Sequence, residues 1–167
     1  MKKSLLFLLI LISCQEETFD PASPSVDQFV SLLRNGEYGR SQPIPNFRPE
    51  QIPNLLRYAS STEKIESFPT NPISSAYHKE IRLGECLLWT IESIRIGYGE
   101  ELSSPRRYPS LNPVLANTDS SPEQWQAATD EEVLQAVQAY TNWWNDARTF
   151  AEKRTTDPLE NTSLAWR

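Results

Sequence analysis

Residues 82–96, RLGECLLWTIESIRI, predict a helix with apolar side chains on nearly every side. Leu83, Leu87 and Ile91 follow the helical spacing of one face, and Trp89 lies off that face. A helix at a protein surface keeps a polar side toward water, so a helix that is apolar all round belongs inside. We therefore expect a central, buried helix with other helices packed around it.

Two helices are predicted before this central one. Ser25 has the character of an N-cap and precedes an apolar periodic segment, which predicts a helix over 26–35. Pro49 suits the first position of a second helix. Because Pro53 removes a further backbone donor, we expect that helix to start late or to kink.

A long helix is predicted after the central one. Thr129 and Glu132 have the spacing of a capping box, and the helix that they open extends to about Lys153. The periodicity places Trp144 near the middle of the apolar stripe and Trp143 at its edge. We therefore expect Trp144 to be buried and Trp143 to be partly exposed. The stripe comprises Val133, Val137, Tyr140, Trp144, Ala147 and Ala151.

The chain contains thirteen prolines, and most of them lie between the predicted helices. They accompany long connections at 60–80 and 103–113, and residues 157–167 show no helical pattern. No segment alternates apolar and polar residues long enough to require a strand. The expected fold is therefore all-α, a compact helical array with long proline-rich loops.

The first residues predict export and a lipid anchor. Lys2 and Lys3 precede a short apolar segment that would span only about 12 Å as a helix, against about 30 Å of hydrocarbon. Residues 1–13 therefore read as a signal peptide. Leu-Ile-Ser-Cys at 11–14 resembles the lipobox of bacterial lipoproteins, which implies cleavage after Ser13 and acylation of Cys14. An ordinary signal peptide that happens to contain a cysteine is the alternative.

The expected mature chain is a short polar tether, 14–24, followed by one helical domain, 25–167. Gln15, where aspartate would mark the inner membrane, favours the outer membrane by resemblance. Glu16 and Glu17 fit either a surface-export mark or a solvated linker, so both the periplasmic face and the cell surface stay open. Without the signal peptide, 14 basic residues face 22 acidic ones, a net charge of −8. Such a domain is a poor nucleic-acid binder.

The sequence contains no phosphate-binding loop, dinucleotide fingerprint or metal-ligand cluster, so we predict neither a cofactor nor a metal. Cys86 and the single histidine, His78, are the candidates for a nucleophilic pair. A cysteine among apolar residues is more often a small buried side chain, and we favour that interpretation.

The candidate binding surface consists of aromatic and charged residues. Glu85 and Glu92 flank Trp89 on the central helix and could grip a sugar or a basic peptide. The favoured alternative is that Trp89 packs internally while the two acids pair with Arg82 and Arg95. The remaining candidates are Trp143 and two arginines of the 103–113 loop, Arg106 and Arg107.

Several short sequence motifs together resemble those of an uncharacterised family of small bacterial lipoproteins, a domain of unknown function. They are NPISS at 71–75, GECLLWTIESIR at 84–95, NP at 112–113, WW at 143–144 and DPLENT at 157–162. The family resemblance implies no activity. The central helix is also similar to the inner helix of HEAT-like α-repeats, which implies a possible HEAT-like packing.

The expected function is a non-enzymatic binding or scaffold module, anchored to the membrane through acyl chains on Cys14. Its partner is an unidentified protein or glycan, and a glycan-binding accessory protein is one specific version. A small periplasmic immunity or inhibitor protein that acts on a basic partner is the alternative. A hydrolase using Glu or Asp for acid–base work is the third possibility.

Overall fold

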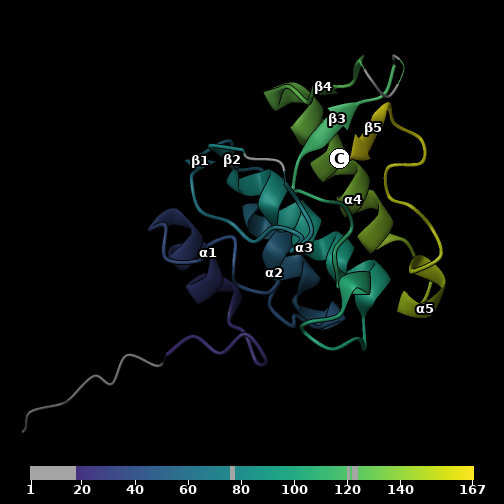
Figure 1. Ribbon diagram of the computed structural model, residues 1–167. Coiled ribbons are helices and arrows are strands. Elements are labelled where there is room, and N and C mark those ends of the chain that lie inside the picture. The colour runs from purple at the N-terminus through teal and green to yellow at the C-terminus, as the bar shows by residue number, and fades with distance from the viewer. Residues whose placement is uncertain (1–17, 76–77, 120, 122–123) are drawn as a thin grey trace, which may run out of the picture.

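The computed structural model describes residues 18–75, 78–119, 121 and 124–167 (Figure 1). The predicted signal peptide, Cys14 and Gln15 lie outside these residues. Within the described part of the chain, no helix is both long and apolar enough to cross a membrane.

The first helices begin where their caps predict. Helix α1 comprises Val26–Arg34, and the Ser25 hydroxyl accepts a hydrogen bond from the Gln28 amide at 3.5 Å. A 3-10 turn, η1 (Pro49–Gln51), leads into α2, Ile52–Ala59. The late start of the second helix is therefore confirmed.

Helix α3, Leu83–Gly97, is the centre of the protein, with α2 and α4 packed against it (Figure 1). Every residue of α3 except Arg95 and Ile96 is buried, which confirms the central helix. The contact between α2 and α3 is close because Gly84 presents no side chain to the end of α2. A Cβ at Gly84 would lie 2.1 Å from the Ala59 carbonyl oxygen.

The long helix expected to reach Lys153 is in fact two helices. Thr129 caps α4, Asp130–Asn145, as predicted, but the backbone turns extended at Asp146 (ψ 146°). The Asp146 carboxylate accepts a hydrogen bond from the Arg148 amide at 2.8 Å, and a new capping box then opens α5, Phe150–Lys153. A short polar side chain that accepts a hydrogen bond from a backbone amide nearby in the chain competes with continuation of the helix.

The order of burial predicted for the two adjacent tryptophans is wrong. Trp143 is 5% exposed and Trp144 is half-buried. Because α4 ends at Asn145, its buried stripe comprises Val133, Ala136, Tyr140 and Trp143, while Ala147 and Ala151 lie exposed outside it.

The all-α prediction, and with it the HEAT-like array, is also wrong, because the fold adds two small antiparallel sheets to its helices. In one, β1 (Lys64–Ile65), inside the connection expected at 60–80, pairs with β2 (Ile81–Arg82), which directly precedes α3. In the other, β3 (Leu115–Asn117) lies between β4 (Gln126–Ala127) and β5 (Leu164–Trp166). Strands of two or three residues are too short to show alternation.

Packing of the domain begins before residue 25. The Phe19 ring contacts the rings of Phe29 and Tyr38, with centroids 6.1 and 5.4 Å away. The Pro21 carbonyl accepts from the Asn46 amide at 2.7 Å, and the Pro24 carbonyl accepts from Gln51 Nε2 at 2.8 Å. Residues 19–24, which the sequence assigned to the tether, are therefore attached to the core.

Candidate functional site

Glu85, a candidate contact residue, is buried and connects the start of α3 to its surroundings. Its carboxylate pairs with Arg82 at 3.0 Å and accepts a hydrogen bond from the Leu115 amide at 3.2 Å. Arg82 also forms a short ion pair with Asp130 at the start of α4. These bonds join α3 to β3 and α4, so Glu85 is a structural residue.

Glu92 belongs to a second internal network. It forms a two-pronged ion pair with Arg95 and accepts a hydrogen bond from the Tyr140 hydroxyl at 2.8 Å. Trp166 Nε1 in turn donates to the Tyr140 oxygen at 3.0 Å. Burial raises the pKa of Tyr140 well above its usual value, so its hydroxyl stays a donor. The alternative that both acids pair with arginines is confirmed.

The two candidate tryptophans are both interior. Trp89 is fully buried, and its Nε1 donates to the Ser110 hydroxyl at 2.9 Å. Trp143 Nε1 donates to the Lys153 carbonyl at 3.1 Å, which ties α4 to α5. Neither ring presents a broad face to solvent, and this removes the proposed aromatic contact surface.

Cys86 and His78 do not have the environment of a nucleophilic pair. The Cys86 side chain is wholly buried, and burial raises the pKa of its thiol far above the usual value. The thiolate is the reactive form of cysteine, so this side chain is chemically protected. His78 lines an open cleft with Lys64 and Glu80.

The two adjacent arginines have opposite environments. The Arg107 side chain is buried and donates to Asn46 Oδ1 at 2.7 Å and to the carbonyls of Pro45 and Ile44 at 2.9 and 3.4 Å. The Arg106 side chain is 80% exposed and reaches Glu100 at 3.4 Å. Of this pair, Arg106 alone is accessible to a partner.

The loop at 60–80 contacts the loop at 103–113. The Asn71 amide donates to the Leu111 carbonyl at 3.2 Å, and the Ser74 hydroxyl donates to Asn112 Oδ1 at 2.9 Å. Ile73 is 80% exposed at this junction. This exposed side chain makes the junction a local apolar projection.

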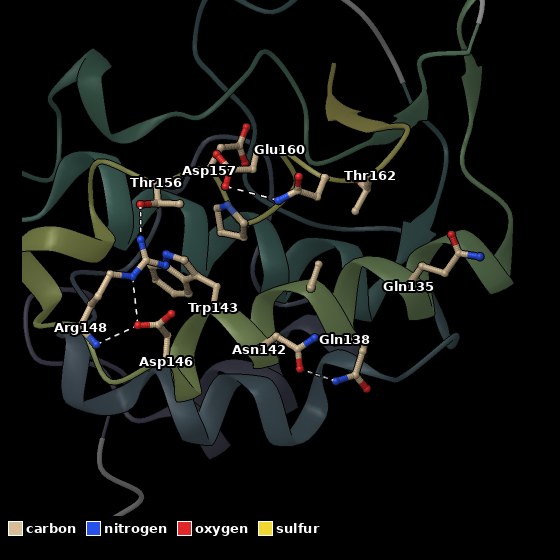
Figure 2. A pocket seen from close by; sticks show the side chains of 13 residues that line it. Gln135, Gln138, Asn142, Trp143, Asp146, Arg148, Thr156, Asp157, Glu160 and Thr162 are labelled. Atoms are coloured by element: carbon tan, nitrogen blue, oxygen red, sulfur yellow. Dashed lines mark hydrogen bonds and ion pairs between the residues drawn. The ribbon is translucent and has the colours of Figure 1, made fainter.

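A groove lies between α4 and the segment 156–162, with a volume of about 410 Å³ (Figure 2). In Figure 2, side chains of α4 line one side, and Thr156, Asp157, Glu160 and Thr162 line the other. Most of its side chains are amides, carboxylates or hydroxyls. It is lined by Gln135, Gln138, Ala139, Asn142, Trp143, Asp146, Arg148, Thr156, Asp157, Pro158, Glu160, Asn161 and Thr162.

The segment that forms the second wall has a defined shape. Pro158 and Leu159 are buried, which attaches the segment to the core. The Asp157 carboxylate accepts from the Leu159 amide at 2.8 Å, and the Thr162 hydroxyl donates to the Leu159 carbonyl at 2.8 Å. These local bonds hold the wall in place without a ligand.

Arg148 closes one end of the groove (Figure 2). Its Nε contacts Asp146 Oδ1 at 3.0 Å, and its terminal nitrogen donates to the Thr156 hydroxyl at 2.7 Å. The arginine therefore spans from the end of α4 to the opposite wall. Hydrogen bonds from the Arg148 backbone and side chain lower the pKa of Asp146, so this carboxylate is ionised at neutral pH.

The described residues contain no group of three or more His, Cys, Asp or Glu side chains arranged to hold a metal ion. The groove has three carboxylates, but they are interspersed with amides and an arginine. Its chemistry is that of hydrogen bonding to a polar ligand.

Sequence reasoning identified Trp143 but missed the rest of this groove. The usable signal was the outer face of the 130–145 helix, where Gln135, Gln138 and Asn142 recur at spacings of three and four. Residues 157–162 form one of the motifs of the family resemblance, but the sequence does not show which element they pack against. Their meeting with α4 depends on tertiary packing.

The chain belongs to the family described as a domain of unknown function, DUF4943, which matches residues 20–167. The family boundary agrees with the packing that begins at Phe19. No curated protein and no solved structure matches the chain.

Proposed function

We propose that this protein is a non-enzymatic binding module, held at the outer membrane by acyl chains on Cys14, whose ligand occupies the groove between α4 and residues 156–162. The observation that carries the proposal is the groove itself. It is open and preformed, and exposed polar side chains of two different elements face it. A preformed site avoids the cost of ordering its walls when the ligand binds.

Three acids, one in the groove and two on the central helix, favour binding over catalysis. Acid–base hydrolysis by two carboxyl groups needs one with a raised pKa to act as the acid. In the groove, the pKa of Asp146 is lowered, which is the opposite direction. Glu85 and Glu92, the acids singled out on the central helix, are buried in ion pairs with Arg82 and Arg95.

Membrane attachment is proposed from the lipobox at 11–14, supported by the place where packing begins. Since Phe19 already contacts the core, a short linker of residues 14–18 would separate the acyl chains from the domain. Fully extended, those residues span at most about 18 Å. The domain would therefore stay close to the bilayer, with a reach shorter than a long flexible tether allows.

The groove can be tested by filling it. Asn142 is exposed on α4, so Asn142→Trp should place an indole in the groove without disturbing the core. The full chain, purified in detergent, should sediment with the detergent-insoluble fraction of isolated cell envelopes, which offers no bilayer to the acyl chains. Asn142→Trp should weaken this binding about tenfold, or about 1.4 kcal/mol. Glu131→Trp, exposed on the same helix outside the groove, is the matched control and should bind as the wild type does.

Two results would contradict this proposal. Equal sedimentation of both tryptophan variants would remove the groove from the binding site. Release of soluble fragments from the envelopes during incubation with wild-type protein, measured by chromatography of the supernatant, would show an enzyme.

The anchor has its own test. Protein extracted from membranes should have the mass of a chain that begins at Cys14 and carries acyl groups, and Cys14→Ser should leave the membrane fraction or remain unprocessed. Membrane-extracted protein that keeps residues 1–13 unmodified would exclude the lipoprotein assignment.

A further inference from the structure

The wall of the groove formed by α4 presents three side-chain amides beside Ala139 and Trp143. Gln135, Gln138 and Asn142 are all exposed, and Gln138 Nε2 donates to Asn142 Oδ1 at 2.7 Å. That bond engages one donor of Gln138 and one acceptor site of Asn142, and each amide has further donors and acceptors. The mutual bond also orients both amides before a ligand arrives.

The opposite wall contributes mainly acceptors. Asp157 and Glu160 are exposed, and one oxygen of Asp157 is engaged by the Leu159 amide. A ligand hydroxyl can donate to a carboxylate on this wall while it accepts from an amide N–H on the other. A ligand with several hydroxyl groups matches a groove in which donors and acceptors face each other.

We infer that the groove binds an uncharged oligosaccharide, an inference that rests on the proposed function and names its ligand class. The other ligand classes fit less well. Hydrophobic ligands need largely apolar walls, and Trp143, at the floor, is only 5% exposed. Anions would meet the carboxylates, whereas a basic peptide would meet the Arg148 guanidinium at one end.

The buried state of Trp143 sets how the sugar is held. Carbohydrate sites often use an open aromatic face, but this indole is packed inside and its Nε1 is bonded to the Lys153 carbonyl. Recognition here comes from hydrogen bonds that the sugar forms with the side chains of both walls. Binding should consequently depend on the amides and carboxylates and respond weakly to salt, because no ion pair forms with the ligand.

The experiment uses the full chain in detergent and calorimetry with three defined probes, cellotriose, maltotriose and triacetylchitotriose, with hexalysine as the charged comparison. At least one trisaccharide should bind, and its Kd should change less than about twofold between about 0.05 and about 0.5 M NaCl. Asn142→Ala should raise that Kd about tenfold. Glu131→Gln, outside the groove, should leave it unchanged.

A second variant separates a sugar from a cation. Asp157→Asn together with Glu160→Gln keeps the shape of the wall and the Oδ1 acceptor of the Leu159 amide, but removes both charges. It should weaken trisaccharide binding no more than about tenfold, since neutral acceptors remain. If the wild type binds hexalysine but no trisaccharide, and the double variant no longer binds hexalysine, the groove is a cation site and the inference is overturned.

The failures are distinguishable. If the protein sediments with envelopes through the groove but binds none of the three trisaccharides, the sugar inference is overturned and the binding module stands. If neither Asn142→Ala nor the double variant changes the Kd for the trisaccharide, the sugar binds outside the groove, and the sugar inference is again overturned. If filling the groove leaves envelope binding unchanged, the proposed function itself falls.

Discussion

Replacing Arg107 with alanine should destabilise the protein by about 3–4 kcal/mol. The buried guanidinium donates to Asn46 Oδ1 and to the carbonyls of Pro45 and Ile44. Its removal would take this donor from the buried Ile44 carbonyl, while the Pro45 carbonyl would keep its bond from the Phe47 amide. Hydrogen bonds from a charged donor contribute about 1.5–3 kcal/mol, and a buried acceptor left without a partner costs about 1–3 kcal/mol. Urea denaturation followed by circular dichroism measures the change.

The neighbouring residue is the control for this prediction. Arg106 is 80% exposed, and its contact with Glu100 is a surface ion pair at 3.4 Å. Arg106→Ala should therefore change the free energy of unfolding by less than about 0.5 kcal/mol. Equal effects of the two substitutions would mean that the 103–113 loop does not pack as described.

Gly84→Ala should destabilise the protein by about 3 kcal/mol, the upper part of the range for overpacking. Helix propensity alone predicts the opposite, a gain of about 1 kcal/mol, because alanine is the better helix former. The clash decides the sign, since the new Cβ would lie 2.1 Å from the Ala59 carbonyl oxygen and 2.8 Å from that of Ser61. Both atoms belong to the backbone and cannot move aside without separating α2 from α3.

Gly36→Ala separates steric crowding from backbone strain. Gly36 has a positive φ of 71°, and a Cβ there would meet no atom within 4 Å. The cost is then the left-handed conformation alone, about 1–2 kcal/mol. If thermal denaturation finds Gly84→Ala to be neutral or stabilising, the close approach of α2 to α3 is incorrect.

The helices with strong local signals were predictable from the sequence. Ser25 and Thr129 cap α1 and α4 through side chains that act on the next few residues, so their role is visible in the order of amino acids. The central helix was visible because its apolar character extends round the whole circumference. The strands were not, because β3 pairs with β5, which is distant in the chain, and all five strands of the described residues are very short.

The candidate site was largely unpredictable for a related reason. Chemical type singled out Glu85, Glu92, Trp89 and Arg107, yet each is buried in the interior by bonds to other segments. Helix α4 ends where the Asp146 carboxylate accepts a hydrogen bond from the Arg148 amide. Neither the capping box nor the apolar periodicity predicts this bond, so the end of the helix could not be placed from them. The groove arises only once residues 156–162 pack beside α4.

The position of β3 has a consequence for when this chain can fold. Its register joins Ala116 to Ala165, and the nearby Tyr140 hydroxyl accepts a hydrogen bond from Trp166. The sheet, and the internal network that ends on Glu92, cannot be completed until residues 164–166 are available. Closing such a distant pairing costs entropy before its contacts form, so it occurs late. A chain shortened before residue 164 would therefore lack both the β3–β5 pairing and the hydrogen bond from Trp166 to Tyr140.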